Sequence, residues 1–341
     1  MTKTSRRSVL GLGLATGLGL TASACGVSDA LNEGAEHVLL GGHQLAAGTP
    51  FDKGLTKFGE LVAEKTSGRV RVDAHPNAAL GTETEMFQGL ITGTLDIGIV
   101  APGSIAEFSP EMSILSMPFL VIDRDQRDAL LTGGIAERLA GLLTERTKTL
   151  PLTYFGGSFR QMFFTQPATT LDDIRGRLFR VQPSAVLTDS FSAAVGVQPS
   201  VVAYNELYNA LQQGVVDGAD NEPVFIDSQK FYEPAPHILQ TNHEVTIRPL
   251  IISQRTIDKL GPELGALVME AGAEAGEYQR RHEAEIDDSI LGDLAGRDGI
   301  VVTPVDTAPV LDSVQPVWQR YAEQWGIPDV LEQIIDLRPG S

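Results

Sequence analysis

Two arginines interrupt apolar, strand-like stretches of the sequence and are its clearest candidates for binding chemistry. Arg160 lies in "GGSFRQMFF" and Arg180 lies in "RLFRVQ". A guanidinium cannot be deprotonated in a protein, and its burial is tolerated where an anion meets it in good geometry. Because its planar fork of donors suits bidentate capture of a carboxylate, the two arginines predict a small organic acid as the ligand.

A structural role is the alternative for both arginines. The chain carries a formal charge of −18, so it has many carboxylates that could form salt bridges with them. For Arg160 both hypotheses stay open, whereas for Arg180 the salt-bridge hypothesis is weaker because large apolar neighbours, Phe179 and Val181, flank it. The same acidic charge repels nucleic acid, so no nucleic-acid partner is predicted.

The motifs that would indicate an enzyme are missing from the sequence. It has no G-x-S-x-G elbow, no H-E-x-x-H, no C-x-x-C and no G-x-x-x-x-G-K-[ST]. Its six histidines are scattered, with no pair at ligand spacing on one helix, so neither a metal site nor a cofactor is predicted. The prediction is a binding protein and not an enzyme. An exported hydrolase with a serine or carboxylate site is the alternative, since triad residues are assembled in space.

Residues 1–25 have the features of an export signal. "SRRSVLGLGLATGLGLTASAC" combines a basic start, a short Gly-rich apolar stretch and small residues before Cys25. Because Cys25 is the single cysteine and lies at this junction, we predict that it is lipidated; an ordinary cleavage site with loss of the cysteine is the alternative. The sequence thus predicts an exported protein, anchored by lipid in the periplasm or at the outer face of the cytoplasmic membrane. Export by the twin-arginine or the general route stays open.

Strands and helices alternate along the rest of the chain, which predicts an α/β fold with mostly parallel pairing. A first run predicts strands at 37–43, 69–75 and 95–100, with helices at 50–67 and 83–93. A second run predicts strands at 150–155, 161–165, 177–181, 197–202 and 217–220, with helices at 184–195 and 204–213.

Two segments are long enough to connect two lobes. Residues 243–253 are apolar enough to cross from one lobe to the other, and the apolar face that follows Pro262 predicts a long helix that braces both. We predict that residues 36–157 plus about 246–286 form lobe I and residues 158–245 plus about 287–338 form lobe II. A cleft between the two lobes is the expected ligand site.

The stretch from Asp172 to Glu233 closely resembles the substrate-binding subunits of tripartite ATP-independent periplasmic (TRAP) transporters, the DctP-type family. Its most specific part is "LQQGVVDG" (211–218), with Arg180 at the family's arginine position before it and Asn221 at the asparagine position after it. The resemblance continues through residues 59–99 and spans nearly the whole chain after the signal. It implies a periplasmic-binding-protein-like receptor that closes over a solute acid and passes it to TRAP membrane permease subunits.

The resemblance also implies roles for single residues. Arg180 would pair with the ligand carboxylate, Asn221 would donate to it, and Arg160 would hold the same group or a neighbouring oxygen. Further polar contacts are expected from four side chains: His43, Gln44, Glu85 and His243. The alternative for Glu85 is that it only stabilises a helix N-terminus.

The stretch 230–253 resembles family members that take sugar acids, particularly hexuronates. A hexuronate has one carboxylate and several hydroxyls, so it needs an arginine and a polar lining. Binding of a C4-dicarboxylate or a 2-oxo acid in the same transporter class is the alternative, and a sensory receptor with the same fold is another. Tyr204 replaces a frequent tryptophan and Gln182 stands where proline is common, which leaves the identity of the solute open.

Overall fold

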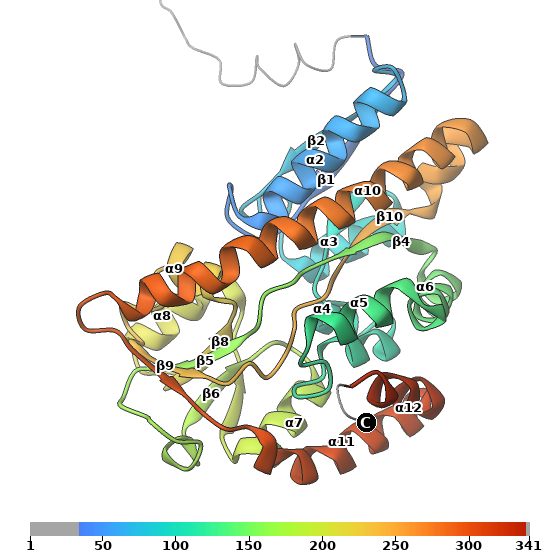
Figure 1. The fold of residues 1–341 in the computed structure, drawn as a ribbon. Helices are drawn as coiled ribbons and strands as arrows, with labels where there is room; N and C mark the ends of the chain where they lie inside the picture. The colour runs from blue at the N-terminus through green and yellow to red at the C-terminus, as the bar shows by residue number, and fades with distance from the viewer. Residues whose placement is uncertain (1–33, 339–341) are drawn as a thin grey trace, which may run out of the picture. The chain divides into compact units, whose positions relative to one another are not determined.

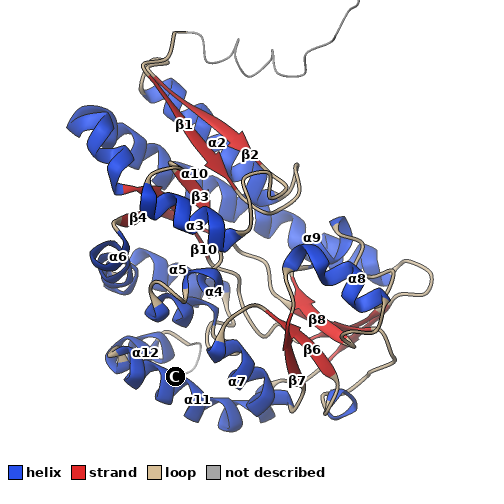
Figure 2. Cartoon of the chain, turned by 180° about the vertical axis from the view of Figure 1, so that it is seen from behind, coloured by secondary structure: helices blue, strands red, loops and turns tan. Residues whose placement is uncertain are grey.

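The computed structural model describes residues 34–338, and the export signal and Cys25 predicted from the sequence lie outside this range. The described residues form two β-sheets with helices packed against them (Figure 1, Figure 2). This arrangement confirms the predicted α/β fold with two lobes. No helix within residues 34–338 is both long and apolar enough to cross a membrane.

The first sheet has the strand order β2-β1-β3-β10-β4. Its strands are β1 (His37–Gly42), β2 (Val70–His75), β3 (Ile97–Ile99), β4 (Thr149–Phe155) and β10 (Arg248–Ser253). The helices between these strands in sequence are α2 (Pro50–Lys65), α3 (Glu83–Thr92), α4 (Pro102–Ile105), the 3-10 helix η1 (Pro110–Ser116), α5 (Arg124–Thr132) and α6 (Gly134–Thr147). A core of large side chains on α2, including Phe51 and Phe58, fixes this sheet against the helix.

The second sheet has the strand order β11-β9-β5-β8-β6-β7. Its strands are β5 (Gln161–Phe164), β6 (Leu178–Val181), β7 (Gln198–Val201), β8 (Gly218–Asn221), β9 (His237–Gln240) and β11 (Val301–Pro304). The helices between them in sequence are η2 (Asp172–Ile174), α7 (Ala185–Val195), η3 (Tyr204–Glu206), α8 (Leu207–Gln212), α9 (Pro223–Ser228) and α10 (Gln254–Ala295). The chain ends with η4 (Ala308–Val310), α11 (Leu311–Trp325) and α12 (Pro328–Asp336).

Five of the nine strand pairings in the described residues are parallel, so the predicted majority of parallel pairing is narrow and both sheets are mixed. β10 pairs antiparallel with β3 and β4, and β5 pairs antiparallel with β8 and β9. Both strands arrive directly from the other sheet, without the helical crossover that a parallel connection needs. A strand that enters in this way is free to run against its neighbours.

Two short segments carry the chain between the sheets and run beside each other. Residues 156–160 join β4 to β5, and residues 241–247 join β9 to β10. Phe159 and Val245 form an antiparallel bridge between them, and Thr246 N donates to Ser158 O at 3.0 Å. Gly156 has φ +122°, and a Cβ there would lie 2.0 Å from Thr246 O, so only glycine allows this close approach. The lobe limits predicted at 157/158 and at about 245/246 fall in these segments, and the limit predicted at about 286/287 falls within the helix α10 (Gln254–Ala295); all three stay predictions.

The helix α10 runs along both sheets (Figure 1). Gly261 has non-helical backbone (φ 75°, ψ 174°), so the uninterrupted part begins at Pro262, as the sequence predicts. The helix packs on α2 and β4 of the first sheet and on α9 and β11 at the second. This confirms a long helix that braces both.

The last two helices, α11 and α12, help to fix the position of α7, the helix that follows Arg180 in sequence. α11 packs against α7, and α12 contacts α6 (Figure 2). Trp318 is buried and its Nε1 donates to Pro118 O at 3.1 Å, while the Tyr321 hydroxyl donates to Asp189 of α7 at 2.8 Å. These contacts fix α7, and with it the end of β6, against the first sheet's helices.

Candidate functional site

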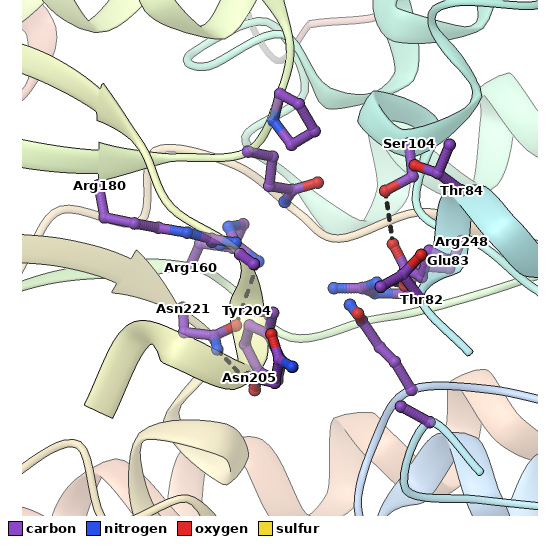
Figure 3. Close-up of a pocket in the computed structure, with 15 residues that line it drawn as sticks. Thr82, Glu83, Thr84, Ser104, Arg160, Arg180, Tyr204, Asn205, Asn221 and Arg248 are labelled. Carbon is purple, nitrogen blue, oxygen red and sulfur yellow. Dashed lines mark hydrogen bonds and ion pairs between the residues drawn. The ribbon is translucent and has the colours of Figure 1, made fainter. Parts of the chain in front are cut away.

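A cavity of about 210 Å³ lies where the two sheets face each other, and side chains of both line it (Figure 3). The strand β1 of the first sheet and the parallel pair β6 and β8 of the second sheet direct their carboxyl ends toward it, which is the usual place for a ligand in an α/β protein. Its lining residues are Gln44, Ala78, Thr82, Glu83, Thr84, Ser104, Arg160, Arg180, Gln182, Pro183, Ala203, Tyr204, Asn205, Asn221 and Arg248.

Arg180 reaches the cavity because β6 alternates its side chains between two faces. Phe179 and Val181 point into the apolar core, so Arg180 points the other way. Its Nε donates to Val202 O at 3.0 Å, and its guanidinium carbon lies 5.8 Å from the centre of the Tyr204 ring. Within residues 34–338 no carboxylate lies within 4.0 Å of it, although Arg180 is only 3% exposed. Burial lowers the pKa of Arg180 to about 10.

Arg160 lines the same cavity but is already neutralised by the protein. Its Nε donates to Asp220 Oδ2 at 2.6 Å and its Nη1 to Glu222 Oε2 at 2.7 Å. Burial alone would lower the pKa of Arg160, but the surrounding carboxylates raise it above its ordinary value. The pKa of Asp220 is lowered in turn, because Arg160 and His243 outweigh the effect of burial. For Arg160 the structure therefore contains the salt bridges that the sequence left as an alternative.

Arg248, at the start of β10, is a third arginine of the cavity and was missed in the sequence. Its Nη1 donates to Glu83 Oε1 at 3.0 Å, and its Nη2 lies 3.8 Å from Glu222 Oε1. The other oxygen of Glu83 accepts from Ser104 Oγ at 2.7 Å. Arg248 interrupts the apolar stretch "VTIRPLII" in the way that Arg160 and Arg180 interrupt theirs, so the same pattern could have revealed it.

Of the other predicted site residues, Asn221 and Gln44 line the cavity. Asn221 ends β8, and its amide Nδ2 donates to the Tyr204 hydroxyl at 3.2 Å while its Oδ1 accepts from Arg160 at 3.2 Å. Gln44 follows β1, and its side-chain amide has no hydrogen-bond partner in the described part of the chain. The structure thus brings Arg160, Arg180, Asn221 and Gln44 together around one space.

Three predicted site residues do not line the cavity. Glu85 accepts from the backbone N and the hydroxyl of Thr82, both at 2.8 Å, and so completes a capping box at the start of α3. His43 is buried, and its Nε2 lies 3.2 Å from Asp52. His243 lies between the Phe119 and Phe191 rings behind the cavity, with its Nε2 3.3 Å from Asp220. The predicted ligand contacts of these three residues stay a prediction, and their positions outside the cavity lining do not support it.

The charges of the cavity are almost balanced without a ligand. Its arginines are Arg160, Arg180 and Arg248, and the carboxylates that form ion pairs there are Glu83, Asp220 and Glu222. Glu244 is also buried nearby, and burial raises the pKa of its side chain to about 8, so it is mostly neutral at pH 7. Across residues 34–338 no group of three or more histidine, cysteine, aspartate or glutamate side chains is placed to hold a metal ion.

Comparison with known proteins gives a consistent picture. Residues 41–324 match the family model of bacterial extracellular solute-binding proteins, family 7 (DctP). A solute-binding protein of Sulfitobacter sp. is 37% identical over 302 residues, 88% of this chain and 91% of that protein. A TRAP periplasmic solute-binding protein from Sulfitobacter sp., solved with bound α-D-taluronate, is 36% identical with a TM-score of 0.84 over 87% of this chain and 97% of that one. Another, from Sulfurospirillum deleyianum with bound succinate, is 27% identical with a TM-score of 0.79 over 89% of this chain and 100% of that one.

Proposed function

Because this chain belongs to the bacterial extracellular solute-binding proteins of family 7, the DctP family of TRAP transport, we propose that it captures a hexuronate or a closely similar sugar acid and delivers it to a TRAP membrane permease. The family consists of solute-binding transport proteins, so we propose binding without catalysis. The ligand enters the cavity between the two sheets and is enclosed when the lobes close.

The state of Arg180 is the observation that carries this proposal. It is a buried guanidinium that faces the cavity and has no carboxylate within 4.0 Å in the part of the chain that the structure describes. A buried charge in this condition is unfavourable until an anion meets it. The carboxylate of a sugar acid supplies that anion in the planar geometry that a guanidinium binds best.

The remaining lining suits the hydroxyls of a sugar acid. The side-chain amides of Gln44, Gln182 and Asn205 have no hydrogen-bond partner within residues 34–338, so each offers a donor and an acceptor to a ligand. Glu83 keeps lone pairs available beside its two contacts. The bound taluronate of the Sulfitobacter protein, which has one carboxylate and several hydroxyls, is a ligand of this kind.

The proposal extends to residues outside the described range. We propose that residues 1–25 direct export and that Cys25 carries a lipid anchor, which would hold the receptor at the outer face of the cytoplasmic membrane close to its permease. Incorporation of a radiolabelled fatty acid into the expressed protein, and its loss in Cys25→Ala, tests the anchor. If the expressed protein incorporates no fatty acid and is released when membranes are washed, the lipid anchor is contradicted.

Calorimetric titration of the purified protein with D-galacturonate, D-glucuronate, succinate, 2-oxoglutarate and neutral D-galactose tests the function. We expect binding of the hexuronates, no binding of galactose, and unchanged ligand after overnight incubation. At a ligand concentration of 100 times Kd the protein should gain about 2.7 kcal/mol of stability. If succinate alone bound tightly, the proposed ligand would change from a sugar acid to a dicarboxylate. Hydrolysis or any other turnover of the ligand would contradict the proposal that the chain is a binding protein.

A further inference from the structure

The Glu83–Arg248 ion pair lies in the cavity on the side opposite Arg180 (Figure 3). We propose that this pair makes the cavity selective for ligands with a single negative charge, because Glu83 cancels the cation that would otherwise bind a second carboxylate. The inference rests on the proposed function and adds the charge class of the ligand to it: sugar acids with one carboxylate are accepted and sugar diacids are rejected.

Burial and hydrogen bonds fix the geometry of the Glu83–Arg248 pair. Both side chains are almost fully buried, and Glu83 Oε1 lies 3.0 Å from Arg248 Nη1. Ser104 donates to the second oxygen of Glu83 at 2.7 Å, which fixes the carboxylate from α4. Glu83 begins the helix α3, which packs on the first sheet, and Arg248 begins the strand β10 of that sheet, so both are anchored on regular elements.

Glu83 is the residue that neutralises Arg248. The nearest other carboxylate, Glu222, lies 3.8 Å from Arg248 but only 2.7 Å from Arg160, where it makes a direct hydrogen bond. Glu222 also accepts from Thr246 Oγ1 at 2.9 Å, so its position is fixed away from the lining. If Glu83 lost its charge, Arg248 would face the cavity as a second cation with little compensation.

Whether a ligand is accepted depends on the charge of the end that lies opposite Arg180. A sugar acid that places its carboxylate on Arg180 presents hydroxyls to the opposite side, where Glu83 can accept and Arg248 can donate hydrogen bonds. A diacid in the same position would place its second carboxylate against the carboxylate of Glu83, and like charges at close range in a buried site repel strongly. Rejection by such a repulsive group is a common source of specificity.

The test compares two ligands in three forms of the protein. D-Galacturonate has one carboxylate, and galactarate has the same carbon skeleton with a carboxylate at each end. We expect the wild-type protein to bind galacturonate at least tenfold more tightly, Glu83→Gln to lower this ratio at least tenfold by improving galactarate binding, and Arg248→Gln to raise it. D-Galactonate, an open-chain acid with one carboxylate, controls for the shape of galactarate.

Glu85→Gln is the matched control, because Glu85 lies two residues away on the same helix and outside the cavity lining; its ratio should equal that of the wild type. A purely structural role of the ion pair predicts that both substitutions weaken both ligands by the same factor, and this result, or an equal affinity of the wild type for the two acids, would overturn the inference. Glu83→Gln and Arg248→Gln are expected to change the ratio of the two affinities in opposite directions. If one variant does not fold, the other alone still tests the inference. Failure of the wild type to bind galacturonate would contradict the proposed function instead.

Discussion

Arg180 and Arg160 line the same cavity in opposite electrostatic situations. Arg180 faces the cavity with one backbone acceptor and an aromatic ring, whereas Arg160 is held by Asp220, Asn221 and Glu222. Both are buried, and both interrupt apolar stretches of the sequence. From this difference we predict that Arg180, which has no carboxylate within 4.0 Å in the described residues, binds the ligand carboxylate. Arg160 instead stabilises the acidic end of β8.

Substitution of Arg160 should have the largest effect, and it should be on stability. Arg160→Met leaves Asp220 and Glu222 buried without their strongest cation, which costs about 3–5 kcal/mol of unfolding free energy. Denaturation in urea measures this loss. Arg180→Met is the matched control: it removes a buried cation that has no carboxylate, so stability should be unchanged or higher. If Arg160→Met and Arg180→Met destabilised the protein equally, the proposed difference between the electrostatic environments of the two arginines would be contradicted.

The effect of Arg180→Met should instead be on binding. Removing the partner of a buried ligand carboxylate costs about 2–5 kcal/mol of binding free energy. Calorimetry with D-galacturonate, at a temperature where both proteins are folded, measures the change. Affinity within threefold of the wild type would show that Arg180 is a structural residue.

Glu283 on α10 is the acidic counterpart of Arg180, because it is buried and no cation lies within 4.0 Å of it in the described part of the chain. A carboxyl, unlike a guanidinium, can relieve this by protonation, and burial raises the pKa of Glu283 to about 7. At this site the folded protein keeps a proton that the unfolded chain releases near pH 4.5, so the contribution of Glu283 to stability falls as the pH rises from about 4.5 to about 7.

Glu283→Gln should remove this contribution, while the similar contribution of buried Glu244 remains in both proteins. The variant should be more stable than the wild type above pH 7, by roughly 1–3 kcal/mol. Urea denaturation of both proteins at pH 5 and pH 8 measures the difference. Glu277→Gln, on the same helix, is a control that should follow the wild type. A wild-type stability that rises from pH 5 to pH 8 relative to Glu283→Gln would contradict the assignment.

The smallest effect is expected for Glu85. Glu85→Ala removes half of the capping box of α3, so the melting temperature should fall by about 2 °C. The affinity for D-galacturonate should stay within twofold of the wild type, since Glu85 lies outside the cavity lining. A tenfold loss of affinity would restore Glu85 as a ligand contact, as the family resemblance implied.

Patterns local in sequence predicted most of the strands, but β9 and β11 and several helices, among them α5, α6, α9 and α12, were not predicted. Helical spacing and Gly93 gave the limits of α3, and Pro262 marked the start of the uninterrupted part of α10. Strand direction was not predictable in this way, because it depends on β5 and β10 arriving from the opposite sheet.

The same limit applies to the site. The pattern of a charge among apolar residues found Arg160 and Arg180, but their different roles depend on carboxylates about 60 residues away in sequence. The choice between Glu83 and Glu85 was within reach, because "TETE" (82–85) is a capping-box pattern that assigns Glu85 to the helix start and leaves Glu83 for the cavity. His243 could not be placed, since its position between Phe119 and Phe191 is set by tertiary packing.

The most direct test of the central claim is whether Arg180 recognises the carboxylate of the ligand. The affinities of the wild type and Arg180→Met for D-galacturonate and for its neutral amide, D-galacturonamide, form a four-way thermodynamic cycle. If Arg180 is the anion site, the wild type should prefer the acid at least 100-fold and Arg180→Met should lose nearly all of that preference. The same preference in both proteins would place the carboxylate elsewhere and contradict the account.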